Sequence, residues 1–229
     1  MPQRASGGPG GRPPRTSRAA ILSAAHNLID RDGWQNLTIR RLATEIGTSP
    51  ATVYYHVRDK EDLLLLLLNE YASQIPQPDL PPKPRDRIIE AATAMHDALA
   101  AWPWAAEVLS ADGFVGLLGP SALWLVEAIV AGAMDHGCTP AQAVGVFRGI
   151  WYYTVGEVLV RAHSAGRRAD DERPTYRDTP DFSSFDASRL PHLAAISDQW
   201  PRLASQDTYP QGLRALVDGL LAQATSPAP

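Results

Sequence analysis

The segment LTIRRLATEIGTSPATVYYHVRDK, residues 37–60, predicts two short helices joined by a tight turn. Thr38 can cap a first helix whose apolar side chains recur at helical spacing, and Gly47 stands where that helix would end in a left-handed residue. Ser49 is a candidate N-cap for the second helix, and Pro50 fits its first position, where no N–H donor is needed. The pattern is that of a helix-turn-helix.

The second helix of this pair has two different faces. Val53 and Val57 are expected to face inward, which leaves Thr52, Tyr55 and His56 on the outward face. In a helix-turn-helix the outward face of the second helix enters the major groove of DNA. The alternative is a buried helical hairpin whose tyrosines belong to the core.

Residues 52–64, TVYYHVRDKEDLL, closely resemble the end of the DNA-binding domain in the tetracycline-repressor (TetR) family. The resemblance implies that Arg40 reads a base and that Lys60 contacts the DNA backbone. It also implies an operator that differs from that of the repressor which gives the family its name, because Pro50 replaces a glutamine able to read adenine. The full set of expected DNA contacts is Thr38, Arg40, Ser49, Pro50, Ala51, Thr52, Tyr54, Tyr55, His56 and Lys60.

Charge is distributed unevenly along the 229 residues, whose net charge is −4. Residues 1–58 carry eight arginines and three carboxylates, a balance of +5, so the remainder carries −9. This asymmetry places the phosphate-binding potential in the first quarter of the chain and makes the rest unsuited to nucleic acid.

Composition excludes several classes of protein. The longest apolar run, Leu63–Leu68, is far shorter than a membrane span, and the N-terminus has no apolar stretch of signal-peptide length. We therefore expect a cytoplasmic protein without a membrane partner. The single cysteine, Cys138, excludes an intrachain disulfide and a cysteine-cluster zinc site.

The expected fold is all-α, with an N-terminal three-helix helix-turn-helix domain and a C-terminal helical domain for ligand binding and dimerisation. Residues 1–14 are expected to be a disordered basic arm, and residues 15–75 the DNA-binding domain with a connecting helix. The connecting helix contains six leucines in a row, which predicts burial on every side. Residues 83–225 form the second domain, in which residues 166–186 are expected to be a mobile loop. Expected helices cover residues 16–32, about 88–99, 104–110, 120–136, 139–163 and 210–224.

Two helices of the second domain predict a homodimer. Residues 153–159 and 212–220 resemble the two helices that form the dimer interface in the family. Small residues recur along both helices, at Gly145, Gly149 and Gly156 and again from Gly212 to Ala222. Such stripes let backbones approach closely, either between two chains or within one.

The aromatic content of the second domain predicts a site for a small organic effector. Aromatic walls with a few polar groups are the usual lining of a drug-sized site, and the alternative is that these side chains are plain core. No metal or cofactor is expected, because Leu109 and Val160 match the positions that hold a magnesium–drug chelate in the family's namesake. The expected lining consists of Met95, His96, Trp104, Trp124, Phe147 and Trp151.

The sequence contains no enzyme motif: G-x-S-x-G, H-E-x-x-H, a Walker loop and a dinucleotide fingerprint are all missing. His96 and Asp97, which are adjacent on a helix, are expected to point apart. The prediction is therefore a ligand-responsive transcriptional repressor that binds a palindromic operator as a homodimer and is released by a hydrophobic or aromatic effector. The alternatives are a DNA-binding regulator without a small-molecule trigger and, more remotely, an all-helical enzyme.

Overall fold

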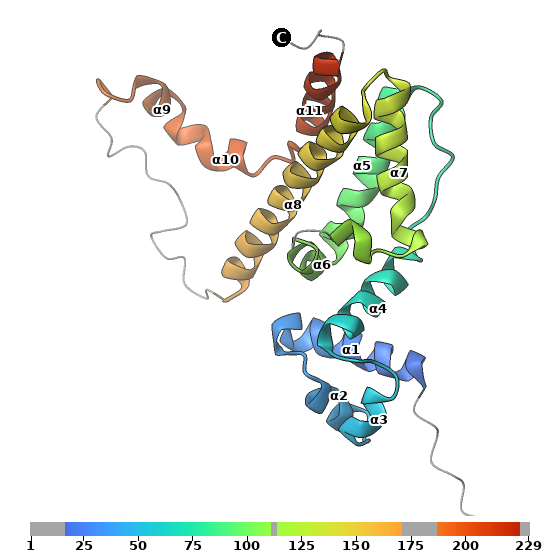
Figure 1. Ribbon diagram of the computed structural model, residues 1–229. Coiled ribbons are helices and arrows are strands. Elements are labelled where there is room, and N and C mark those ends of the chain that lie inside the picture. The colour runs from blue at the N-terminus through green and yellow to red at the C-terminus, as the bar shows by residue number, and fades with distance from the viewer. Residues whose placement is uncertain (1–16, 111–113, 171–186, 225–229) are drawn as a thin grey trace, which may run out of the picture. The chain divides into compact units, whose positions relative to one another are not determined.

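The computed structural model describes residues 17–110, 114–170 and 187–224, and in these residues it contains helices and no strand (Figure 1). The chain divides into two compact units, residues 1–73 and residues 74–229. The expected basic arm and residues 171–186 of the expected loop lie outside the described residues.

Unit 1 consists of α1 (Arg18–Asp32), the 3-10 turn η1 (Trp34–Asn36), α2 (Ile39–Glu45), α3 (Pro50–Tyr54) and α4 (Lys60–Ala72). Its α-helices begin at the side-chain caps that their sequences favour, namely Ser17, Thr38, Ser49 and Asp59. The expected left-handed residue is confirmed, because Gly47 ends the turn after α2 with φ of +66°. Helix α1 packs on both α2 and α4, and α2 packs on α3.

The leucine run of α4 is not buried on every side, so that expectation was wrong. Leu63, Leu64, Leu67 and Leu68 are buried, whereas the two leucines between these pairs are half-buried. The reason is geometric: side chains at positions i, i+1, i+4 and i+5 share one face of a helix, and α4 turns that face toward α1.

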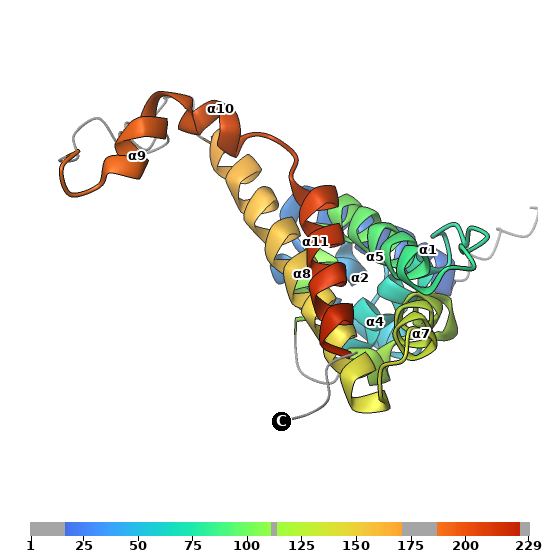
Figure 2. The same ribbon diagram turned by 90° about the horizontal axis from the view of Figure 1, so that it is seen from above.

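Unit 2 contains α5 (Pro84–Ala101), α6 (Pro103–Val108), the turn η2 (Phe114–Leu117), α7 (Pro120–Asp135), α8 (Pro140–Asp170) and α11 (Tyr209–Ala224) as its larger helices and their links. Each of these five α-helices has a proline within its first two positions, where the missing N–H costs no hydrogen bond. Helices α5, α7 and α8 pack on one another, and α11 lies beside α8 and α5 (Figure 2).

Close approach between α5 and α7 depends on one glycine. A Cβ atom added to Gly132 would lie 2.7 Å from Cγ1 of Ile88. Ion pairs join α5 to two of its neighbours: Arg87 lies 2.8 Å from Asp135 at the end of α7, and Arg85 Nη2 lies 2.9 Å from Asp218 on α11. These contacts hold α5 at the centre of unit 2.

Two parts of unit 2 differ from the expected fold. Residues 166–170 continue helix α8 rather than starting a loop. Sequence reasoning also missed α9 (Pro191–Ile196), the turn η4 (Ser197–Gln199) and α10 (Trp200–Ala204), because these short elements show no sustained helical period. No side chain of α9, η4 or α10 is buried, and the segment extends away from the other helices of unit 2 (Figures 1 and 2).

Across the part of the chain that the structure describes, each helix is too short or too polar to cross a bilayer.

Candidate DNA interface and ligand site

Helix α3 presents aromatic side chains to solvent. Val53 and Val57 are buried, as predicted, and they anchor the helix in the core of unit 1. Tyr54 is 55% exposed and Tyr55 is 87% exposed. The alternative of a hairpin with core tyrosines is therefore wrong. Two adjacent exposed tyrosines make this face a candidate for contact with a partner.

Several hydroxyls among the expected DNA contacts also cap helices. Thr38 Oγ1 accepts the backbone N–H of Arg41 at 3.2 Å, and Ser49 Oγ accepts that of Thr52, also at 3.2 Å. Ser49 and Thr52 are further joined through their side-chain oxygens at 3.0 Å. Pro50 and Ala51 are exposed in the first turn of α3, and the half-buried His56 sets its ring edge against Tyr55.

Most arginines near α2 and α3 already have partners. Arg41 Nη2 lies 2.6 Å from Asp32, and its Nη1 donates to the Asn36 carbonyl at 3.1 Å. The same pattern holds elsewhere: Arg31 pairs with Glu45 and Arg58 with Asp62. Hydrogen bonds from these arginines lower the pKa of both carboxyl groups.

Arg40 is different from these paired arginines. Its side chain is exposed, and its guanidinium has no hydrogen-bond or ion-pair partner among the described residues. A free guanidinium can donate two hydrogen bonds to a guanine edge.

Lys60 is held within unit 1. Its ammonium donates to the Gln35 carbonyl at 3.0 Å and lies 5.1 Å from the centroid of the Trp34 ring. Partial burial lowers the pKa of Lys60. The side chain therefore links the start of α4 to η1, a role that the sequence did not reveal.

The six side chains of the expected ligand site lie on α5, α6, α7 and α8, which pack on one another in pairs. Met95, Phe147 and Trp151 are buried, and His96, Trp104 and Trp124 are half-buried. Nε1 of Trp124 is buried and donates no hydrogen bond within the described part of the chain. A buried donor without an acceptor costs about 1–3 kcal/mol, so a ligand that supplies an acceptor there would gain affinity.

His96 does not stand apart from Asp97 as expected. Its Nδ1 lies 3.0 Å from Asp97 Oδ1, and its Nε2 lies 2.9 Å from Glu157 Oε2 on α8. The ring also stacks on Tyr209 of α11, with 3.8 Å between centroids. Asp97 reaches its neighbour because its carboxylate can rotate back along the helix surface. The imidazole is therefore held between α5, α8 and α11.

Sequence reasoning missed the partners of His96. Glu157 is largely shielded from solvent and also pairs with Arg161. Tyr209 is buried, its hydroxyl lies 2.8 Å from the buried Thr154 hydroxyl, and burial raises its pKa to about 12. The sequence does contain one indication: Glu157 is the only glutamate of a mostly apolar helix. Such a glutamate is expected to have a polar partner, but the sequence does not identify which residue that partner is.

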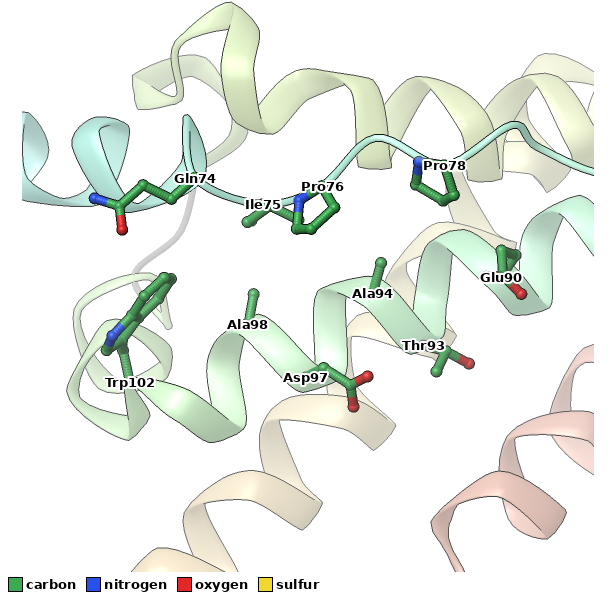
Figure 3. A pocket seen from close by; sticks show the side chains of 10 residues that line it. All are labelled: Gln74, Ile75, Pro76, Pro78, Glu90, Thr93, Ala94, Asp97, Ala98 and Trp102. Carbon is green, nitrogen blue, oxygen red and sulfur yellow. The ribbon is translucent and has the colours of Figure 1, made fainter.

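Two open grooves belong to unit 2, and neither is lined by the six expected ligand-site residues. One, of about 380 Å³, lies between residues 74–78 and α5 (Figure 3). The other, of about 780 Å³, runs along α8 from Tyr152 to Ser164 and is closed by residues 204–208. Within the described residues, no group of three or more His, Cys, Asp or Glu side chains could hold a metal ion.

Taken with the exposed α3, this architecture defines a helix-turn-helix regulator with a separate helical domain. Residues 21–67 match the family of bacterial regulatory proteins named tetR, and residues 77–224 match the tetracyclin repressor-like C-terminal domain. The chain therefore belongs to the TetR family of transcriptional regulators and is not an enzyme.

Two relatives align along most of the chain. An HTH-type transcriptional regulator of Saccharopolyspora erythraea is 29% identical and aligns over 92% of this chain and 87% of its own. The class A tetracycline repressor protein from transposon 1721 of Escherichia coli is 26% identical over 87% and 88% of the two chains.

Two solved structures share the fold. Streptomyces coelicolor ActR in complex with (S)-DNPA superposes with a TM-score of 0.69 at 21% identity, over 91% of this chain and 98% of that one. BioQ bound to its double-stranded DNA operator superposes with a TM-score of 0.62 at 23% identity, over 90% and 99%.

The different environments of the two neighbouring arginines predict different effects on stability. Replacement Arg41→Ala removes an exposed ion pair and a hydrogen bond, so it should lower the free energy of unfolding by about 1 kcal/mol. Replacement Arg40→Ala should change it by less than about 0.5 kcal/mol, because the side chain has no partner to lose. Urea unfolding of both variants checks this, and equal losses would show that Arg40 is structurally engaged.

Proposed function

We propose that this regulator binds a roughly palindromic operator as a homodimer through α3 and is a repressor. The observation that carries the proposal is the exposed surface of Tyr54, Tyr55 and the unpaired Arg40, which nothing in unit 1 covers. BioQ, a protein of the same fold, was solved on its operator. Thr38, Ser49 and Thr52 would add phosphate contacts, while Pro50 and Ala51 bring the backbone of α3 toward the bases.

Arg40→Ala should weaken binding to the preferred operator by about 1–3 kcal/mol and relax preference at one base pair, because it removes a base contact. Selection from random duplexes followed by titration at fixed salt measures both effects. Arg202→Ala, an exposed change on α10, is the matched control and should leave the affinity unaltered. If selection with the unaltered protein enriches no motif, the chain does not recognise an operator sequence.

A homodimer is supported by an apolar stripe on the outside of α8. Tyr152 and Val160 are exposed and lie eight residues apart, so they are separated by about 80° around the helix and share one face. Gly156 lies on the same stripe, and a Cβ atom added there would meet nothing within 4 Å. A second α8–α11 pair covering this face would make a four-helix interface.

The small residues of α8 and α11 divide into two groups. A Cβ atom added to Gly149 would lie 3.1 Å from Leu220 Cδ1, and one added to Gly212 would overlap the Tyr153 ring. These two glycines therefore serve packing within one chain. At Gly145, Gly156 and Gly219 an added Cβ atom would meet nothing within 4 Å, so these three glycines are free to serve an interface.

Gly156→Leu should weaken the dimer at least about tenfold, which corresponds to about 1.4 kcal/mol, because the new side chain would hold the partner's backbone away. Sedimentation at several concentrations measures the dissociation constant. Ala100→Leu, the same kind of enlargement at an exposed position of α5, is the control. A monomer at micromolar concentration in the unaltered protein would refute the dimer itself.

The effector of the proposed switch is an organic, largely apolar and aromatic molecule, bound without metal. Its site would draw on Met95, His96, Trp104, Trp124, Phe147 and Trp151. The buried N–H of Trp124 calls for an acceptor on the ligand, and His96, held by Glu157, is a rigid orienting group. ActR, which shares the fold, was solved with the small molecule (S)-DNPA.

Release follows if the effector binds the DNA-incompetent arrangement more tightly, and a preference of about 1.4 kcal/mol suffices for a tenfold loss of operator affinity. Titrating the protein–operator complex with planar hydrophobic compounds in the presence of a chelator should show release. Trp124→Phe should weaken the response, whereas Trp200→Phe on α10 should not. Binders that leave operator affinity unchanged would favour the regulator without a trigger, and release that needs magnesium would refute the metal-free site.

A further inference from the structure

The outer face of α5 forms a groove with the extended segment that precedes it. Residues 74–78 run alongside the helix, and the space between them has a volume of about 380 Å³ (Figure 3). This is within the size range of small-molecule sites. Its walls use the face of α5 opposite Met95, so the groove is distinct from the expected effector site. The lining residues are Gln74, Ile75, Pro76, Pro78, Glu90, Thr93, Ala94, Asp97, Ala98 and Trp102.

The middle of the groove is lined by small apolar side chains. The methyl groups of Ala94 and Ala98 point toward the proline-containing segment, and the Trp102 ring closes one end below Gln74 (Figure 3). Alanines at these two positions leave the space open that larger side chains would fill. Pro76 lies opposite them and cannot donate a backbone hydrogen bond into the groove. The central walls therefore suit a flat or elongated apolar body.

Charge in the groove has one sign. Glu90 and Asp97 line it, and no lysine or arginine does. Glu90 has no ion-pair partner among the described residues, and the described partner of Asp97 is His96, which is held on its other side by Glu157. Seven residues separate the two carboxylates, about 10 Å along a helix, which is too far for both to ligate one metal ion.

We propose that this groove binds an organic cation: an ammonium group on an aromatic or aliphatic body. The ammonium would lie near Glu90, and the body would lie along Ala94 and Ala98, whose methyl groups point toward residues 74–78 (Figure 3). The unpaired Glu90 carboxylate attracts the cation, and the apolar wall of Ala94 and Ala98 shields the body from water. Because binding of a cation in this groove does not require DNA, the groove can be tested independently of the proposed effector.

The test uses a matched pair of probes with the full chain, measured by calorimetry without DNA. The probes are 1-naphthylmethylamine, which is a cation at neutral pH, and 1-naphthalenemethanol, which has the same body without charge. The amine should bind at least about fivefold more tightly than the alcohol, with an advantage that shrinks at high salt, whereas the effector site, which selects apolar aromatic bodies, should not favour the amine. Equal affinities, or no saturable binding of the amine, would overturn the proposal.

Variants then locate the site. Glu90→Gln should weaken the amine about threefold to fivefold and leave the alcohol unchanged, as expected for an exposed carboxylate. Ala98→Leu should remove the advantage of the amine over the alcohol by filling the groove, without loss of helix content. Glu127→Gln, which removes an exposed carboxylate of α7, is the control and should have no effect. If the advantage of the amine over the alcohol survives Ala98→Leu, the cation binds elsewhere and the groove is refuted.

Discussion

The exposed surface of α3 depends on the burial of Val53 and Val57. Helix α3 has only five residues, too few to persist in water by its own hydrogen bonds. The two valines, both almost inaccessible to solvent, hold it against the core of unit 1. Because successive side chains of a helix point in different directions, fixing the valines inward also fixes Tyr54 and Tyr55 outward. The same burial of the two valines therefore stabilises α3 and keeps its tyrosines exposed.

Ion pairing reshapes the charge of unit 1. The first quarter of the sequence is strongly basic, yet Arg31, Arg41 and Arg58 are each neutralised by a carboxylate within the same unit. Lys60 is likewise held by η1 and by the Trp34 ring. A paired cation attracts phosphate less than a free one, because its field is partly cancelled at short range. The sequence total therefore overstates the positive charge available at the surface, and Arg40 is an exposed donor near α3 that has no ion-pair partner among the described residues.

Helix α8 serves two environments at once. Its inner side carries Thr154 and Glu157, which bond to Tyr209 and His96 and so join α5, α8 and α11. Its outer side carries exposed Tyr152 and Val160, with Gly156 between them. Buried polar groups that are satisfied only by one another define a single packing arrangement, because any shift leaves them without partners. The hydrogen bonds of Thr154 and Glu157 therefore fix how α8 is rotated, and so keep Tyr152 and Val160 on the outside.

The sequence alone determined the helical class, the helix-turn-helix, its caps and the left-handed Gly47, because these follow from local periodicity and backbone sterics. It could not determine that Gly149 packs against Leu220 of the same chain whereas Gly156 contacts no neighbouring side chain, since both positions are glycine. Nor could it show that Arg41 is paired while Arg40 is free, although the two are adjacent. Such differences arise from side chains distant in the chain, such as Asp32 and Leu220, and only packing in three dimensions brings those partners within reach.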